Sequence, residues 1–177
     1  MSKLIIPVGV PGSGKSTLAA TIPGAIVLSS DNIREELFGD ANLQYTEEYA
    51  AKKIKQKKID TSDLSYEKLL ALKIHLCNAS VFGTLNYRVK KALKEGKDVV
   101  YDATNISAKT RKGILKSFAG LYDSAEAYFF DIPIETAIER NNKRDRVVPV
   151  EVIERMFKDL VAPTKSEGFS EVHIITD

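Results

Sequence analysis

The feature that most constrains the fold is a glycine-rich stretch of nine residues, Gly9 to Thr17, with the sequence GVPGSGKST. It follows an apolar run at residues 4–8 and precedes helix-forming residues at 16–22, so we expect a strand, a loop and a helix in that order. The stretch fits the pattern G-x-x-x-x-G-K-[ST], whose glycines let backbone N–H groups surround phosphate oxygens at a helix N-terminus. The sequence therefore predicts a phosphate-binding loop, or P-loop.

The side chains of the loop indicate which phosphates it binds. Lys15 is expected to reach the β and γ phosphates of ATP, and the Ser16 hydroxyl is placed to ligate Mg²⁺. The residues expected to hold the nucleotide are Gly12, Ser13, Gly14, Lys15, Ser16 and Thr17. A glycine-rich turn that binds nothing is disfavoured, because it would need neither the lysine nor the hydroxyl.

Alternating strand and helix patterns follow the P-loop. The predicted strands are residues 25–28, 99–101, 125–130 and 172–175, and the predicted helices are 33–38, 108–118, 134–142 and 150–160. Strands separated by helices indicate an α/β protein with a parallel sheet flanked by helices, the P-loop NTPase fold. We expect one domain over residues 1–177, since this length and 44% hydrophobic residues suffice for one core.

The middle of the chain, approximately residues 40–95, is helical in pattern. Apolar residues recur there at steps of three or four, which predicts a buried helical stripe with a break at Gly83. The stripe consists of Leu69, Leu72, Leu76, Ala79, Phe82, Leu85, Val89 and Leu93. His75 and Cys77 lie beside it without metal-ligand spacing, so we expect ordinary packed or surface residues there.

Composition bears mainly on the compartment. The formal charge is only +2, so anionic partners would have to be bound by local groups of cations. A single cysteine and a chain that opens directly into strand-like residues favour the reducing cytoplasm. No apolar run approaches the roughly 20 residues that cross a bilayer, so no membrane association is expected.

Two charged residues follow the second predicted strand. Asp31 lies at the carboxyl edge of the sheet, where open α/β folds bind their ligands, and could accept a proton from an attacking hydroxyl. Arg34, one helical turn later, could face an anionic acceptor. From the residues alone, a helix cap at Asp31 and a solvated Arg34 remain equally open.

A second group of cations lies between the last two predicted helices. Its members are Arg140, Lys143, Arg144 and Arg146, within a predicted small helical lid at approximately residues 140–149. A mobile basic segment could close over the β and γ phosphates during phosphoryl transfer, and a solvated basic loop is the alternative.

Two other P-loop classes fit the sequence poorly. Residues 142–145 match the guanine-reading pattern N-K-x-D, but they follow a helical pattern and no D-x-x-G sequence precedes them. A motor ATPase would usually carry an acidic pair after an apolar strand, whereas the third strand here ends in Asp102-Ala103. A kinase is therefore favoured over a GTPase or a motor.

Several segments together resemble the 5′-kinase domain of bacteriophage and bacterial polynucleotide kinases, within the adenylate-kinase-like P-loop phosphotransferases. The matching segments are IIPVGVPGSGKST, SSDNIR, VVYDATN, FDIPIETAIERNNKR and VVPVEVIERMFKDL. The resemblance implies transfer of the ATP γ phosphate to 5′-OH ends of DNA or RNA, a role in nucleic acid repair, and a bacterial or phage-infected host cell. Acceptor length, the preferred nucleotide donor and the oligomeric state do not follow from it.

The resemblance also implies roles for the site residues. Asp31 would be the general base on the 5′-hydroxyl, and Arg34 would bind the neighbouring phosphate of the acceptor. Arg144 would be the lid arginine on the ATP phosphates, with Arg140 one helical turn before it. Asp102, Thr104 and Asn105 would make polar contacts that orient a metal-bound water or the acceptor, with Asp102 as an outer-sphere partner of Mg²⁺.

Residues 42–80 match the phage kinases poorly, so other acceptors stay open: an aminoacyl-tRNA, a nucleoside or another small hydroxyl compound. A nucleotide-dependent nucleic-acid-binding module without transfer activity is a further alternative. The unmatched stretch contains five lysines within residues 52–58, which could contact backbone phosphates or simply form a solvated helix face. Tyr45, Tyr49 and Tyr66 flank this run and could stack on bases or cover a core edge.

Overall fold

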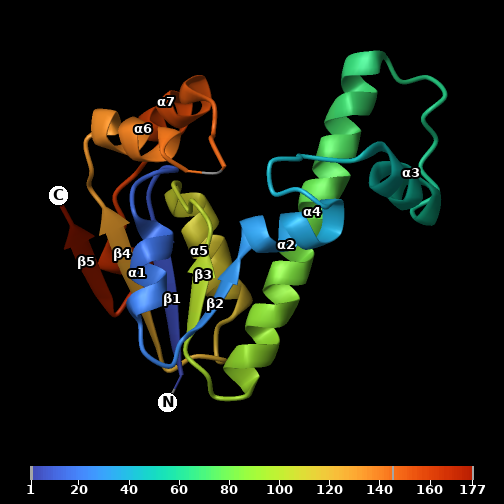
Figure 1. The fold of residues 1–177 in the computed structure, drawn as a ribbon. Coiled ribbons are helices and arrows are strands. Elements are labelled where there is room, and N and C mark those ends of the chain that lie inside the picture. Colours follow the sequence, from blue (N-terminus) through green and yellow to red (C-terminus); the bar gives the residue numbers. More distant parts are fainter. Residues whose placement is uncertain (1, 145, 177) are drawn as a thin grey trace. The chain divides into compact units, whose positions relative to one another are not determined.

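The computed structural model describes residues 2–144 and 146–176 (Figure 1). Its contacts divide the chain into two compact units, Met1–Ser29 with Arg88–Asp177 and Ser30–Tyr87. The expectation of one domain over residues 1–177 stays a prediction.

The first unit is built on a five-stranded, wholly parallel sheet with the order β2-β3-β1-β4-β5. Its strands are β1 Lys3–Val8, β2 Ile26–Ser29, β3 Val99–Asp102, β4 Ser124–Phe130 and β5 Glu171–Ile175. All five strands were expected from the sequence, within one or two residues. The prediction of an α/β fold with a parallel sheet is confirmed.

Helices lie beside this sheet (Figure 1). They are α1 Lys15–Thr21, α5 Ala108–Ser117, α6 Ile134–Asn142, α7 Val150–Lys158 and the short 3₁₀ helix η1 Lys165–Glu167. In Figure 1, α6 and α7 lie over the carboxyl ends of the strands. The central strands β1 and β3 are buried from Leu4 to Val8 and throughout β3, as expected of parallel strands covered on both faces. Because β1 lies between β3 and β4, the P-loop leaves the sheet at its centre.

The second unit contains α2 Ser30–Phe38, α3 Glu47–Gln56 and most of the long helix α4 Tyr66–Lys94. Its buried apolar residues are Ile33, Phe38, Ala50, Leu76, Cys77, Val81 and Leu85. Thr46 caps α3 by accepting a hydrogen bond from the Tyr49 N–H at 3.2 Å. The Phe38 and Tyr49 rings meet edge to face, with centroids 5.1 Å apart, and so join α2 to α3.

Helix α4 corrects two details of the predicted stripe. It runs without a break through Gly83, because a single glycine in a long helix costs only about 1 kcal/mol relative to alanine. Its buried residues step mostly by four, through Cys77, Val81, Leu85 and Val89, whereas Ala79 and Phe82 are exposed. The predicted stripe therefore departs from the buried face of α4 at Ala79 and Phe82.

Two other boundaries differ from expectation. Helix α2 begins directly after β2, at Ser30 instead of Ile33, which puts Asp31 in its first turn, where the helix dipole favours a carboxylate. The predicted helical lid at 140–149 begins as the last turn of α6, and residues 143–144 and 146–149, which lead to α7, are not helical. Within residues 2–144 and 146–176, no helix is both long and apolar enough to cross a bilayer.

Candidate nucleotide and phosphoryl-transfer site

The P-loop takes a conformation that only glycine permits at two positions. Gly12 and Gly14 have φ values of +83° and +102°, in the left-handed region. A Cβ on Gly12 would lie 2.0 Å from the Ala137 carbonyl oxygen of α6. The loop therefore passes so close to α6 that a side chain at Gly12 has no room.

Lys15, the first residue of α1, lies in the curve of this loop. It is 8% exposed, and its ammonium donates to the Val10 carbonyl at 2.7 Å and to the Ser13 hydroxyl at 3.5 Å. Ser13 itself is buried. These contacts keep the cation beside the N-terminus of α1, where an anion would also meet the helix dipole.

Ser16 and Asp102 bring two oxygen ligands together. The Ser16 hydroxyl donates to the Asp102 carboxylate at 3.3 Å, and β3, which ends at Asp102, is the sheet neighbour of β1. Hydroxyl and carboxylate oxygens suit Mg²⁺, which commonly takes one or two protein ligands together with substrate phosphates. Among residues 2–144 and 146–176, no group of three or more His, Cys, Asp or Glu could hold a metal ion by itself. The pair therefore fits a metal that shares its coordination with a nucleotide.

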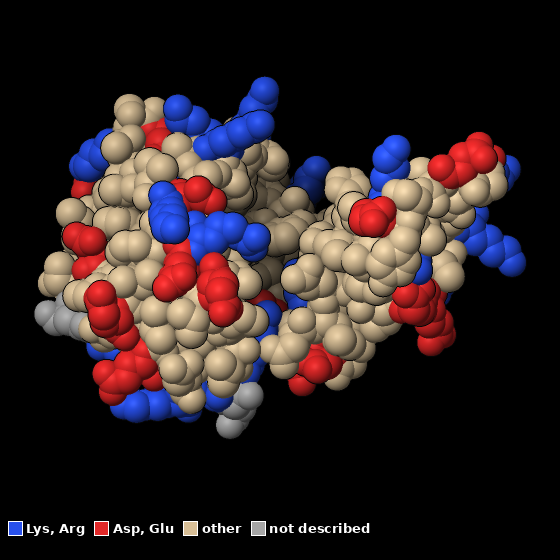
Figure 2. Space-filling model, turned by 90° about the horizontal axis from the view of Figure 1, so that it is seen from above, with Lys and Arg blue, Asp and Glu red and all other residues tan. Residues whose placement is uncertain are grey.

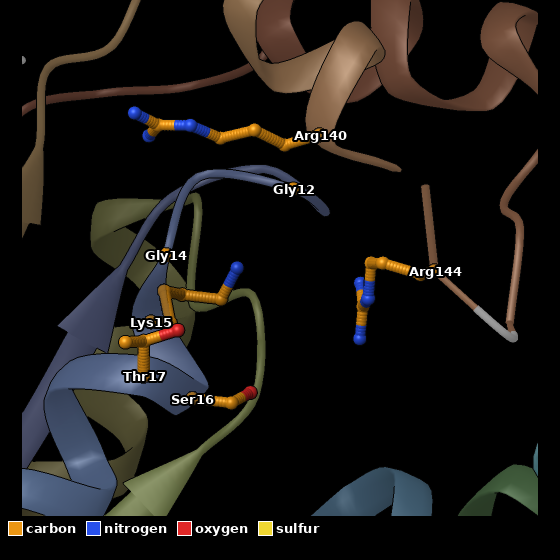
Figure 3. A pocket seen from close by; sticks show the side chains of 7 residues that line it. All are labelled: Gly12, Gly14, Lys15, Ser16, Thr17, Arg140 and Arg144. Carbon is orange, nitrogen blue, oxygen red and sulfur yellow. The ribbon is translucent and has the colours of Figure 1, made fainter. Parts of the chain in front are cut away.

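Two arginines complete a pocket of about 280 Å³ above the P-loop (Figure 3). Its lining residues are Gly12, Gly14, Lys15, Ser16, Thr17, Arg140 and Arg144. Arg140 belongs to the last turn of α6 and extends over the P-loop, whereas Arg144 comes from the following loop and faces Lys15 and Ser16 across the open space. Helix α6 ends at Asn142, so Arg144 does not lie on a continuation of the helix that carries Arg140.

The other cations of the predicted lid behave differently. Lys143 forms an exposed ion pair with Glu139 at 2.6 Å, one helical turn away. Asp145, the last residue of the N-K-x-D match, lies outside the described residues. Of the cations in the predicted lid, Arg140 and Arg144 line the pocket.

Asn141, which the sequence did not single out, fixes the base of the loop that carries Arg144. Its buried side chain donates to the Val148 carbonyl at 2.9 Å and accepts from the Val148 N–H at 3.0 Å. Val10 of the P-loop packs in one apolar cluster with Ala137 of α6 and Ile153 of α7. The strong amphipathic pattern of α7 could have revealed this cluster from the sequence, but nothing in the pattern distinguished Asn141 from Asn142.

In the loop after β3, the Asn105 side chain makes hydrogen bonds to the protein backbone. Asn105 is 4% exposed, and its amide group donates to the carbonyls of Pro7, Tyr101 and Ala103 at 2.9, 3.2 and 3.1 Å. The Thr104 carbonyl accepts a hydrogen bond from the Gly9 N–H at 3.1 Å. We therefore assign Asn105 to tying β1 to β3 below the P-loop, and contact of Thr104 with an acceptor stays a prediction.

Arg111 of α5 is fully buried and supports that loop from behind. It forms a two-point ion pair with Glu167, with N–O distances of 2.8 and 2.7 Å, and donates to the carbonyls of Asn105 and Val161 at 3.0 and 2.9 Å. A fully buried arginine is rare unless it is paired in this way. Sequence reasoning missed it, because a lone arginine in an amphipathic helix gives no sign of burial.

The predicted acceptor residues Asp31 and Arg34 both belong to α2, in the second unit. Within that unit, Arg34 donates to the Asn78 side-chain oxygen at 2.9 Å and to the Leu43 carbonyl at 3.3 Å. Arg34 is thus held by α4 and by the segment before α3, and it is not simply a solvated side chain. Asn78 lies in the stretch that matched the phage kinases poorly and was not predicted.

Comparisons with known proteins agree with this picture. The model of the AAA domain family matches residues 4–163. A protein of Autographa californica nuclear polyhedrosis virus, named as a bifunctional polynucleotide kinase/RNA ligase, is 27% identical over 96% of this chain. The chain spans only 22% of that viral protein. The resemblance to polynucleotide kinases is therefore confirmed at the level of sequence.

Solved structures share the fold. The Pnkp1/Rnl/Hen1 complex matches 84% of this chain and 40% of its own matched chain, with a TM-score of 0.52 and 22% identity. A fungal RNA kinase matches 99% of this chain and 38% of its own chain, with a TM-score of 0.55 and 15% identity. A gluconokinase from Sinorhizobium meliloti matches 98% of this chain and 82% of its own chain, with a TM-score of 0.55 and 15% identity. At these identities the likeness shows a shared α/β fold.

Proposed function

This chain belongs to the AAA domain family, and on that premise we propose that it transfers the γ-phosphoryl group of ATP to the 5′-hydroxyl end of DNA or RNA. The observation that carries the proposal is the pocket in which Lys15, Ser16 and Arg144 surround one space above the P-loop. Such a set of cations and phosphate-binding backbone serves phosphoryl transfer. The viral relative supports a polynucleotide as the acceptor.

On the donor side, the N–H groups at the start of α1 and the Lys15 ammonium bind the β and γ phosphates. Ser16, supported by Asp102, would hold Mg²⁺, which when bound neutralises charge on those phosphates. Arg144 stabilises the charge that spreads over the equatorial oxygens of the transferring group, and Arg140 binds the donor from above the loop.

On the acceptor side, Asp31 takes the proton of the 5′-hydroxyl while its oxygen attacks the γ phosphorus. A bond forms from the 5′ oxygen to phosphorus, the bond from phosphorus to the β–γ bridging oxygen breaks, and ADP leaves. The position of Asp31 in the sequence supports this role: it comes two residues after the last residue of β2, and open α/β folds bind ligands at the carboxyl ends of their strands. Arg34, held by Asn78, binds the phosphate that follows the reacting nucleotide.

A second candidate keeps this chemistry but changes the acceptor to a small hydroxyl compound. The gluconokinase structure supports it, because the fold match covers 98% of this chain and 82% of that enzyme, the second unit included. The sequence relative, by contrast, is named for a polynucleotide acceptor. We favour the polynucleotide because the sequence match at 27% exceeds the 15% identity to the sugar kinase.

A panel of acceptors tests the proposal. The protein is incubated with γ-labelled ATP and Mg²⁺ and offered 5′-OH DNA, 5′-OH RNA, bulk tRNA, nucleosides or gluconate. We expect label on the 5′ ends of the oligonucleotides and no transfer to gluconate. Absence of label from both oligonucleotides would overturn the proposal, and label on a small acceptor alone would establish the second candidate.

Asp31→Asn separates the base from the donor site, because it keeps the shape of the side chain and removes its basicity. We expect ATP binding by titration to stay within about twofold and the rate of transfer to fall by about 10² or more. Arg144→Ala serves as the donor-side counterpart and should lower kcat far more than affinity for the oligonucleotide. Loss of ATP binding in Asp31→Asn would remove Asp31 from the acceptor side.

A further inference from the structure

A group of lysines on and after α3 has no role in the proposed chemistry. We call Lys52, Lys55, Lys57 and Lys58 the α3 lysine cluster. All four are exposed, and among the residues that the structure describes they form no ion pair. The fifth lysine of the run, Lys53, differs: its ammonium lies 5.3 Å from the centre of the Tyr49 ring.

Helix stability alone does not account for the cluster. Cations in the last turn of a helix favour its dipole, and Lys53 and Lys55 occupy that turn. The effect fades beyond the last turn, yet Lys57 is the C-cap and Lys58 lies after it. Like charges at this spacing repel one another, so a polyanion that lies along them would relieve an unfavourable interaction.

The cluster and the predicted acceptor arginine belong to the same compact unit. Arg34 lies one turn before Phe38, whose ring contacts Tyr49 at 5.1 Å, and the cluster begins one turn after Tyr49. At 1.5 Å per residue, α2 rises about 6 Å from Arg34 to Phe38, and α3 with its cap rises about 12 Å from Tyr49 to Lys57. The contact between the Phe38 and Tyr49 rings joins these two paths. The cluster therefore lies within a few nucleotides of Arg34 on an extended strand.

We propose that the α3 lysine cluster binds the phosphate backbone of the acceptor strand several nucleotides from its 5′ end. The inference rests on the proposed function and adds the part of the substrate that it would bind. Tyr49 would not stack on a base, since its ring packs on Phe38 and under Lys53. The formal charge of the chain is only +2, and Figure 2 shows acidic and basic side chains interspersed over the face in view, which favours a backbone contact through a local cluster of lysines.

The test compares acceptors of two lengths. A variant with Lys52, Lys55, Lys57 and Lys58 changed to Gln is assayed on a 5′-OH trinucleotide and a 5′-OH 20-mer. The matched control changes Lys90, Lys109, Lys112 and Lys116 to Gln, four exposed lysines of the first unit, so that the total charge is the same. Both proteins and the unchanged chain are measured at several salt concentrations.

We expect the cluster variant to keep its kcat/KM on the trinucleotide within twofold and to lose about tenfold or more on the 20-mer at low salt. Its slope of log kcat/KM against log salt on the 20-mer should be shallower by about 3, since four single-strand phosphate contacts contribute roughly 0.7 each. The control variant should match the unchanged chain on both acceptors. Equal effects of the two variants, or equal losses on both lengths, would overturn the inference.

Failure of the proposed function would look different. If the unchanged chain phosphorylates neither oligonucleotide, fluorescence anisotropy with a labelled 20-mer still measures the cluster directly. Weaker binding by the cluster variant alone, by about tenfold, would support the surface without the kinase activity. Equal binding by both variants would reject the surface.

Discussion

The shape of the donor pocket depends on a glycine at position 12. Gly12 lies at φ +83°, and a Cβ there would approach the Ala137 carbonyl oxygen to 2.0 Å. We predict that Gly12→Ala forces the P-loop and α6 apart and weakens ATP binding by at least tenfold, measured by calorimetric titration. The clash is with backbone, which cannot rotate away.

Gly120→Ala is the matched control for that change. Gly120 has φ +79° but nothing within 4 Å of the position a Cβ would take. It should therefore carry only the cost of an alanine in the left-handed region, about 1–2 kcal/mol of the free energy of unfolding, and bind ATP normally. Equal ATP affinity in the two variants would show that the P-loop accommodates a Cβ at position 12 and would contradict the predicted clash.

The burial of Tyr101 predicts that the free energy of unfolding falls at alkaline pH. Burial raises the pKa of this phenol to about 12, above its ordinary value of about 10. Between these values the unfolded chain ionises and the folded protein does not, so the stabilisation present below pH 10 is lost as pH rises toward 12. Relative to Tyr101→Phe, the unchanged chain should lose about 2 kcal/mol of unfolding free energy between pH 9 and pH 11.5. Urea denaturation at both pH values measures it, and a constant difference would contradict the burial argument.

At the scale of elements, α4 contains a glycine that it does not need. Gly83 lies inside a helix of 29 residues, and no atom lies within 4 Å of the position of an added Cβ. We predict that Gly83→Ala raises the free energy of unfolding by about 0.5–1 kcal/mol, because alanine loses less backbone entropy on folding. Thermal denaturation should show a Tm higher by about 1–4 °C. A lower Tm would mean that α4 requires flexibility at this point.

Local sequence was sufficient for most elements, because their signals are short-range. The P-loop, the apolar runs of parallel strands and the helix between Ile134 and Asn142 depend on neighbours in the chain, and each was placed within a residue or two. The start of α2 was not, because several residues from Ser29 to Asn32 are equally good caps and the local sequence does not distinguish among them. The contacts of Asn105, Arg111 and Asn141 join distant segments, which no local pattern records.

For the molecule as a whole, Arg111 connects segments that are far apart in the chain. It joins the loop after β3 to the connector at Val161 and to Glu167, across sequence separations of 50 and 56 residues. We predict that Arg111→Met lowers the free energy of unfolding by about 3–5 kcal/mol, because the Glu167 carboxylate is left buried without its partner. Chemical denaturation gives the value.

The double variant Arg111→Met with Glu167→Leu distinguishes the ion pair from the other contacts. Removing both charges should restore part of the lost stability, since an apolar pair avoids the cost of a buried lone charge. A deficit should remain, because the carbonyls of Asn105 and Val161 still lack their donor. A cost below about 1 kcal/mol for Arg111→Met alone would contradict this account.

The two hydrogen bonds between Asn141 and Val148 make the loop that carries Arg144 a convenient place for a reporter group. Its ends are fixed, so a change within the loop need not disturb α6 or α7. The one cysteine of the chain, Cys77, is fully buried, and desolvation raises its pKa, which makes it a poor target for thiol reagents. A Val147→Cys substitution, at a position 49% exposed, would thus accept a fluorophore selectively and report nucleotide binding in real time.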